Sequence, residues 1–322
     1  MAALPNASAH TTRRGMRNGM LMTRRVRISR DEINMTMTAS GLRRIIAASI
    51  GGVALALASA GVVGQGPSSA VAPTTTIKLF DGTSLANFDT WLVDHHEKDP
   101  EKVFTVVDQV DGAPAIRISG QVWGGLLTKQ AYRDYRLIAE FRWGGVTWGN
   151  RKTRTRDSGV LLHCRGRMGN TGKDFNGPWL MSHEFQIIEG GVGDLLPVGG
   201  YSESGEQVLP SITVKARKDR DGENVFDPNG QPQVFNRGRI NWWGRSEDWA
   251  DKLGFRGPQD VESPGLEWTH IEAIVSGNRL QYFVNGKLVN EGTDSSFTDG
   301  KIMIQSEGAE IYFRRIDLEP LK

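Results

Sequence analysis

From Ile77 onward, apolar and polar residues alternate along the chain with a period of two, which is the spacing of a β-strand that buries one face. Short runs with this pattern recur up to the C-terminus and are separated by turn residues. They include YRLIAEFRW, SGVLLHC, HEFQIIE, THIEAIVSG, RLQYFVNGKLVN and GKIMIQSEG. Regular strands without amphipathic helices predict an all-β fold in which two antiparallel sheets pack as a sandwich.

Three local patterns refine this picture. Asn285-Gly286 lies between two apolar runs and predicts a tight hairpin, because both residues tolerate positive φ. The parity of apolar residues reverses near Arg314-Arg315, which predicts a β-bulge there. The segment 246–253, SEDWADKL, has a Ser cap followed by acidic residues and is the one segment expected to be helical.

Composition separates the chain into two regions. Glycine makes up 39 of 322 residues, which suits a turn-rich β fold. Residues 1–64 hold nine of the 39 basic residues and two of the 37 acidic ones, so the remainder carries 30 basic against 35 acidic residues, a net charge of −5. A mildly acidic domain argues against a nucleic-acid partner. With Cys164 as the single cysteine, no intrachain disulfide forms.

The N-terminal region has the pattern of an export signal. Arg43-Arg44 precede the apolar run 45–63, and Ala58-Ser59-Ala60 supplies a small-x-small cleavage site. We therefore assign residues 1–64 to an export signal with its preceding N-terminus, 65–76 to a linker and 77–322 to one β-sandwich domain with a long polar insert at about 216–262. The alternative is an uncleaved signal that stays in the membrane as an anchor. Met35 or Met37 is a more usual start for such a signal than Met1.

Several segments, in order, resemble the 3-keto-disaccharide hydrolase domain family. They are LFDGTSLANFDTWL, GGLLTKQAYRDYRLIAEFRW, DSGVLLH, HEFQIIE, EWTHIEAIVSGNRLQYFVNGKLVN and GKIMIQSEGAEIYFRRIDLEPL. The resemblance covers about residues 77–322 apart from the insert. Asp157, His163 and Glu307 depart from the residues usual in the family, which are Asn, Arg and His. The resemblance implies a concanavalin A-like jelly-roll sandwich that acts on sugars oxidised to a ketone at the third carbon.

Strand parity selects the candidate site residues. Phe185 and Ile187 suit the core, so Glu184 and Gln186 lie on the opposite face of their strand. By the same alternation Gln305 and Glu307 are candidates in IMIQSEG, as are His163 at the end of SGVLLH and Arg142 in LIAEFRW. Trp179 is a candidate for stacking on a sugar ring. A small carbohydrate is the expected partner.

A keto-sugar requires a base to remove the acidified hydrogen beside the ketone, an acid for the leaving oxygen and a group that polarises the ketone. Glu184 and His163 are the candidate catalytic residues. Together with His183 they are also candidate ligands for a divalent metal ion, the one cofactor considered.

Two other functions fit parts of the pattern. A non-catalytic carbohydrate-binding domain would use tryptophans as platforms, and the candidates are Trp123, Trp179, Trp242, Trp243 and Trp249. A laminarinase-type β-glucanase carries Glu-x-Asp-x-x-Glu, and here Glu184 and Glu189 have that spacing while Gln186 replaces the Asp. A Cys–His nucleophile is disfavoured, because the adjacent residues His163 and Cys164 face opposite sides of a strand.

Export to the periplasm or the extracellular space gives the first prediction. Mass spectrometry of the exported protein should find a mature N-terminus between about residues 59 and 66, because signal peptidase cleaves after the small-x-small site. A mature protein that retains residues 45–60 would instead show a membrane anchor.

Overall fold

The computed structural model describes residues 69–322, which form two main β-sheets and a two-stranded ribbon. The strands of the first sheet are β2 (Phe88–Leu92), β5 (Gly124–Thr128), β7 (Asp157–Arg165), β8 (Met181–Ile188), β9 (Leu195–Val198), β12 (Ile212–Lys218), β13 (Asn224–Phe226), β14 (Gln231–Phe235), β15 (Ile240–Asn241) and β19 (Lys301–Ser306). The strands of the second are β1 (Ile77–Lys78), β3 (Phe104–Val110), β4 (Ala113–Ile118), β6 (Tyr135–Thr147), β16 (Thr269–Ser276), β17 (Arg279–Val284), β18 (Lys287–Gly292) and β20 (Ala309–Pro320). The ribbon pairs β10 (Gly200–Tyr201) with β11 (Gln207–Val208).

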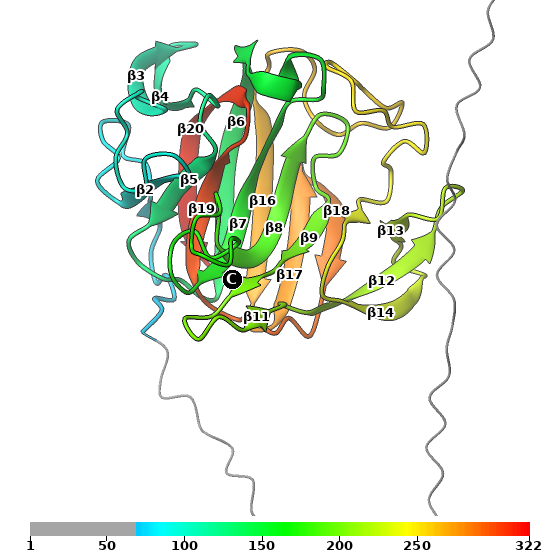
Figure 1. Ribbon diagram of the computed structural model, residues 1–322. Helices are drawn as coiled ribbons and strands as arrows, with labels where there is room; N and C mark the ends of the chain where they lie inside the picture. Colours follow the sequence, from blue (N-terminus) through cyan, green and yellow to red (C-terminus); the bar gives the residue numbers. More distant parts are fainter. Residues whose placement is uncertain (1–68) are drawn as a thin grey trace, which may run out of the picture. The chain divides into compact units, whose positions relative to one another are not determined.

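The two sheets face each other as a jelly-roll sandwich, which confirms the predicted fold class. The first sheet, called the front sheet here, has the order β14-β12-β13-β15-β9-β8-β7-β19-β5-β2. The back sheet has the order β18-β17-β16-β6-β20-β4-β3, with β1 added to β20. In Figure 1 the green strands β7 and β8 cross in front of the orange strands β16 and β17. Within residues 69–322 the pairs of named strands are antiparallel except β13–β15 of the front sheet, which is parallel.

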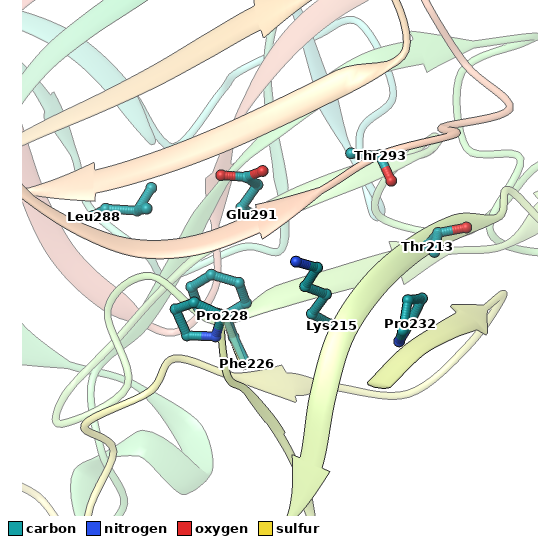
Figure 2. A pocket seen from close by; sticks show the side chains of 8 residues that line it. All are labelled: Thr213, Lys215, Phe226, Pro228, Pro232, Leu288, Glu291 and Thr293. Carbon is teal, nitrogen blue, oxygen red and sulfur yellow. The ribbon is translucent and has the colours of Figure 1, made fainter. Parts of the chain in front are cut away.

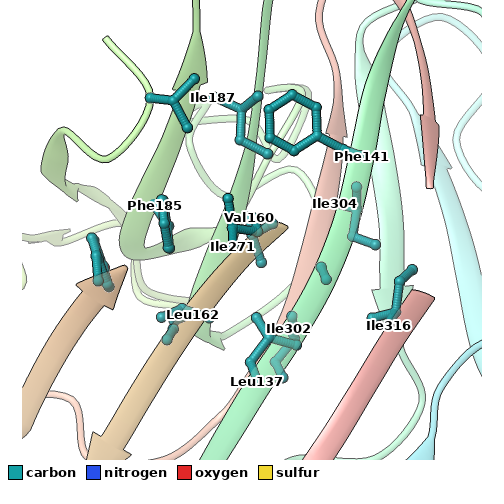
Figure 3. Packing of buried hydrophobic residues seen from close by; sticks show 14 of the residues in the cluster. Leu137, Phe141, Val160, Leu162, Phe185, Ile187, Ile271, Ile302, Ile304 and Ile316 are labelled. Atoms are coloured by element: carbon teal, nitrogen blue, oxygen red, sulfur yellow. The ribbon is translucent and has the colours of Figure 1, made fainter. Parts of the chain in front are cut away.

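The core lies between the sheets and follows the alternation in the sequence. Phe185 and Ile187 of β8 are fully buried and face the back sheet, where Phe141 and Ile271 meet them (Figure 3). Each side chain of this size contributes about 1.5–3 kcal/mol when it leaves water. Since a shift of one residue would turn these side chains outward, the core fixes the strand register and, with it, the outward-facing residues.

Two of the three local predictions are confirmed. Asn285 and Gly286 form the turn between β17 and β18 with φ of 46° and 78°. The β20–β6 register shifts between Phe313 and Arg315, as the parity change indicated. The predicted helix over 246–253 is wrong: the segment forms turns, and its Trp249 donates to the Glu189 carbonyl at 2.9 Å. Contacts with neighbouring loops therefore override its local helical preference.

One short 3-10 helix, η1 (Gly149–Lys152), is the only helix in the part of the chain that the structure describes. None of the helical segments there is long and apolar enough to cross a bilayer. The export signal assigned to 1–64 lies outside the described residues. Within the assigned linker, Val71 already forms a β-bridge with Tyr132.

The insert at 216–262 is tied to the front sheet by a buried carboxylate. Strands β13, β14 and β15 extend the sheet, and the chain from Trp242 onward runs as loops past its end. Asp194 is fully buried, accepts a hydrogen bond from the Trp242 N–H at 2.8 Å and forms an ion pair with the guanidinium of Arg245. A buried charge of this kind is retained only with such partners, so it sets the path of the insert.

Candidate functional site

The face of the front sheet turned away from the core bears a group of long polar side chains at one end of β7, β8 and β19. We call Arg151, Asp157, Glu184, Gln186, Gln305 and Glu307 the carboxylate cluster. Glu184 and Gln186 alternate with the core residues of β8, and Gly159 of β7 pairs with Gln186. The predicted site residues Glu184, Gln186, Gln305 and Glu307 are thus brought together.

Arg151 of η1 joins two carboxylates of the cluster. Its Nη2 donates to Asp157 and, at 3.1 Å, to Oε1 of Glu307. The other carboxylate oxygen of Asp157, Oδ1, accepts a hydrogen bond of 2.5 Å from Nε2 of Gln186. Both oxygens of Asp157 are therefore engaged, whereas Glu307 uses one oxygen for Arg151. Bonds of this charge-assisted kind hold the three side chains in a defined geometry.

Gly159 leaves the space in which Glu184 and Gln305 approach each other. A Cβ atom at this position would lie 2.3 Å from Oε1 of Gln305 and 2.6 Å from Oε1 of Glu184. The Gln305 amide lies close enough to the Glu184 carboxyl to favour its charged form, yet neither polar atom of that amide has a hydrogen-bond partner of good geometry among the described residues. The amide of Gln305 is therefore a buried donor and acceptor open to a ligand.

Burial shifts the acidity of the whole cluster. Removal from water, together with the charge of Asp157, raises the pKa of Glu184 to about 8. Removal from water also raises the pKa of Asp157 to about 7, although Arg151 and Arg239 oppose the rise. The pKa of Glu307 is raised well above its usual value by burial and by the carboxyls of Asp157 and Glu184. Burial therefore favours the neutral, protonated form of all three carboxyls.

Tryptophans lie beside the cluster. Trp123 and Trp179 stack with ring centroids 5.5 Å apart, and Trp123 directly precedes Gly124, which pairs with Ser306 next to Glu307. Trp148 donates its backbone N–H to the Gly308 carbonyl at 2.7 Å, on the other side of Glu307. Trp123 and Trp148 are each 37% exposed. Partly exposed indole rings are of the kind that stacks on the apolar C–H face of a sugar.

The remaining predicted tryptophans differ in their surroundings. Trp242 is 1% exposed and belongs to the core, so it is no platform. Trp249 is covered by the guanidinium of Arg245, whose central carbon lies 4.3 Å from the ring centroid. Trp243 is 39% exposed but lines a different part of the surface.

Arg142 does not join the cluster, and its predicted role in substrate binding is corrected. It belongs to β6 of the back sheet, where Phe141 and Trp143 point into the core. Arg142 therefore lies on the outer face of the other sheet and pairs with Asp111 at 2.5 Å. The alternation identified its side of the strand correctly, but it does not reveal which sheet contains the strand.

His163 also does not reach the cluster. It lies at a bulge of β7 with φ of 57°, and its ring points into the core, where it meets Tyr135 of the back sheet edge-on at 6.0 Å. Its Nδ1–H donates to the Phe297 carbonyl at 2.8 Å. The expected catalytic and metal-binding roles of His163 are corrected, because the bulge turns the side chain to the face opposite Glu184.

The expected metal set is not formed either. His183 has the parity of Phe185 and is likewise fully buried in the core, facing away from Glu184. No group of three or more His, Cys, Asp or Glu side chains suited to hold a metal ion occurs among residues 69–322. Cys164 lies buried beside Leu161, and removal from water raises its pKa well above the usual thiol value, which disfavours the thiolate that a nucleophile requires.

Arg151 and Asp157 belong to the carboxylate cluster, and strand reasoning does not identify them as candidates. Arg151 lies in the short 3-10 helix η1, which has no period-two alternation, so no pattern assigns the direction of its side chain. Asp157 directly precedes SGVLLH and stands out in the sequence only as a departure from the Asn usual in the family. An acid at the start of a buried strand, with an arginine six residues earlier, is the signal that was available.

The structure is a jelly-roll sandwich that carries a buried cluster of carboxyl, amide and guanidinium groups on its front sheet. Residues 75–319 match the family model described as the 3-keto-alpha-glucoside-1,2-lyase-like domain, and the chain belongs to this family. The match also includes the insert, which the sequence resemblance left out.

Several solved structures that are similar to this chain are titled as glycosyl hydrolases, glucanases or carbohydrate binding modules. A protein assigned as a glycosyl hydrolase from Parabacteroides distasonis has 14% identity and a TM-score of 0.42, with 77% of this chain and 94% of that chain covered. The carbohydrate binding module CBM66 from Bacillus subtilis has 13% identity and a TM-score of 0.35, covering 67% and 91%. The β-glucanase of Bacillus licheniformis has 11% identity and a TM-score of 0.29, with 77% of this chain and 92% of that chain covered. At these values the likeness carries no argument about activity. No curated protein matches the chain.

The two buried histidines predict a loss of stability in acid. Burial lowers the pKa of His163 to about 4 and that of His183 to about 3, from a usual value of 6.5. Between pH 6.5 and about 4 these histidines are protonated in the unfolded chain but stay neutral in the folded chain. The free energy of unfolding therefore falls as pH falls through this range.

Chemical denaturation at a series of pH values measures this effect. His163→Asn keeps a donor for the Phe297 carbonyl and tolerates positive φ, so it should flatten the pH dependence. An identical slope in the wild type and His163→Asn would contradict the assignment.

Proposed function

We propose that this protein cleaves the glycosidic bond of 3-keto-glycosides, including 3-keto-disaccharides, by elimination followed by hydration. The observation that carries the proposal is the pair Glu184 and Glu307. The pKa of Glu184 is raised to about 8, that of Glu307 is raised well above its usual value, and both carboxyls lie in one buried cluster. Membership in the 3-keto-alpha-glucoside-1,2-lyase-like family supports the same reaction.

The elimination step assigns a task to each carboxyl. The ketone at C3 acidifies the hydrogen at C2, and ionised Glu184 takes this proton. The electron pair of the C2–H bond forms a C1=C2 double bond while the C1–O bond breaks. Glu307 gives its proton to the leaving oxygen, so the aglycone departs as a neutral alcohol. A pKa of about 8 makes Glu184 a stronger base than an ordinary carboxylate.

The ketone requires hydrogen-bond donors. Gln305 has a buried amide without a partner of good geometry, and Arg151 carries a positive charge between Asp157 and Glu307. Either donor would stabilise the negative charge that develops on the C3 oxygen. Gln186 orients Asp157, and Asp157 in turn fixes Arg151. Gln186 and Asp157 therefore act by positioning Arg151.

Hydration reverses the proton transfers. Water adds its oxygen to C1 while Glu307, now ionised, takes one of its protons, and Glu184 returns a proton to C2. Both carboxyls regain their starting states, and the products are a 3-keto sugar and the free alcohol. The sum is hydrolysis without an added oxidant or reductant.

The alternatives fare differently. A β-glucanase would need Glu189 free, but its carboxylate accepts from Arg156 Nη1 at 2.5 Å and from the Gly254 N–H at 2.9 Å. A non-catalytic carbohydrate-binding domain would use the same tryptophans, so turnover of a keto-sugar distinguishes the enzyme from it.

We also propose, from the export signal in residues 45–63, that the protein acts in the periplasm or outside the cell.

Glu184→Gln tests the role of the base. The change keeps the size of the side chain, and turnover of 3-keto-trehalose or a 3-keto-glucoside should fall by about 100-fold or more, because an acid–base group is lost. In the wild type, kcat/KM should rise with pH up to about 8, where Glu184 becomes ionised. The matched control is Glu140→Gln on the back sheet, where Glu140 pairs with Arg314. A folded, fully active Glu184→Gln protein removes Glu184 from the mechanism.

Gly159→Ala tests the geometry of the site. The added methyl group forces Glu184 and Gln305 apart, and a displacement of about 1 Å at reacting groups costs up to about 100-fold in kcat. Gly145→Ala is the control, since a Cβ there meets nothing within 4 Å. Unchanged kcat in Gly159→Ala, with the fold verified by circular dichroism, would show that this contact does not position the reaction.

A further inference from the structure

A groove separates the insert from the edge of the back sheet. Two adjoining cavities, of about 180 and 350 Å³, share Phe226, Pro228 and Leu288 in their linings and therefore form one groove. Strands β12 and β13 contribute to one side and β18 to the other, as Figure 2 shows for the smaller cavity. We call this space the β12–β18 groove; none of the residues of the carboxylate cluster lines it. Its size is in the range of small-molecule sites.

The groove has an apolar floor and one rigid aromatic ring at its rim. Phe226 is 4% exposed, and Trp243 is 39% exposed. The indole N–H of Trp243 donates to the Leu288 carbonyl at 2.7 Å, and its ring meets the buried Trp242 edge-on at 5.3 Å. Because these contacts fix the ring and occupy its only donor, what Trp243 offers a ligand is the flat apolar surface.

Polar groups of both signs surround this floor. Figure 2 shows Lys215 reaching from β12 toward Glu291, and the ammonium group of Lys215 has no hydrogen bond or ion pair within the described part of the chain. Glu291 is held by Arg279 at 3.0 Å. At the other end, Arg217 lies 3.8 Å from Asp227. Cations and anions are nearly balanced along the groove, which favours an uncharged ligand that both donates and accepts hydrogen bonds.

We propose that the β12–β18 groove is a further carbohydrate-binding site, separate from the carboxylate cluster. An uncharged pyranose places a C–H face on Trp243, gives hydroxyl oxygens to Lys215 and donates hydroxyl protons to Glu291 or Asp227. Charged ligands match the balanced rim less well. No acid–base pair like that of the cluster lines the groove, so the site binds and does not cleave.

The test uses the full chain carrying Glu184→Gln, so that it requires no turnover and is independent of the proposed reaction. Trehalose, maltose and cellobiose are the probes, and saturation-transfer NMR and calorimetry measure binding. Trp243→Ala and Lys215→Ala should each weaken binding by about tenfold, equal to about 1.4 kcal/mol. Val234→Ala is the control, because Val234 lies on neighbouring β14, is 74% exposed and lines neither cavity.

Three outcomes would overturn the proposal. One is no binding of any probe at about 10 mM, a concentration that detects affinities well below those of specific sites. Another is binding that Trp123→Ala abolishes and Trp243→Ala leaves intact, which assigns the sugar to the carboxylate cluster. The third is dimerisation in sedimentation experiments that Trp243→Ala abolishes, which assigns the groove to a second copy of the chain. Lys215→Ala, an exposed change, keeps the test valid if Trp243→Ala folds poorly.

Discussion

The core between the two sheets is the constraint on which the candidate site depends. Phe185 and Ile187 pack against the back sheet, and a strand has only two faces. Glu184 and Gln186 consequently lie on the outer face of the sheet. Gln305 lies on the same face, because its neighbour Ile304 points into the core. A large apolar interface therefore determines the positions of polar side chains that never touch it, and a register shift would destroy the core and the site together.

The site itself opposes folding. Glu184, Asp157 and Glu307 are nearly fully buried, and burial raises the pKa of each carboxyl. For Glu184 the unfolded carboxyl ionises near its usual pKa of 4.5 and the folded one at about 8, so this group weakens the fold progressively as pH rises through that range. Arg151 limits the cost by binding two of the three acids. The core supplies the stability that permits such a cluster, as is general for functional sites.

Sequence reasoning assigned side chains to the correct face where they follow a regular strand and to the wrong face where the backbone departs from one. Alternation placed Glu184, Gln186, Gln305 and Glu307 together on the outer face of one sheet. The side chain of His163 was assigned to the wrong face, because a bulge with positive φ turns it into the core. No pattern in SGVLLH predicts that bulge. Arg142 was misplaced because alternation gives the side of a strand but not its sheet. Arg151 was not identified, because the four-residue helix η1 is too short to show a hydrophobic period.

The insert links the cluster and the β12–β18 groove through Asp194. This buried carboxylate binds the Trp242 N–H, and the next residue, Trp243, forms the rim of the groove. Arg239 lies 3.7 Å from the same carboxylate and its charge favours the ionised form of Glu184. One buried anion therefore holds both the arginine that tunes the site and the chain that carries Trp243. A change at Asp194 would disturb both regions, whereas changes at Trp243 and Glu184 act on one region each.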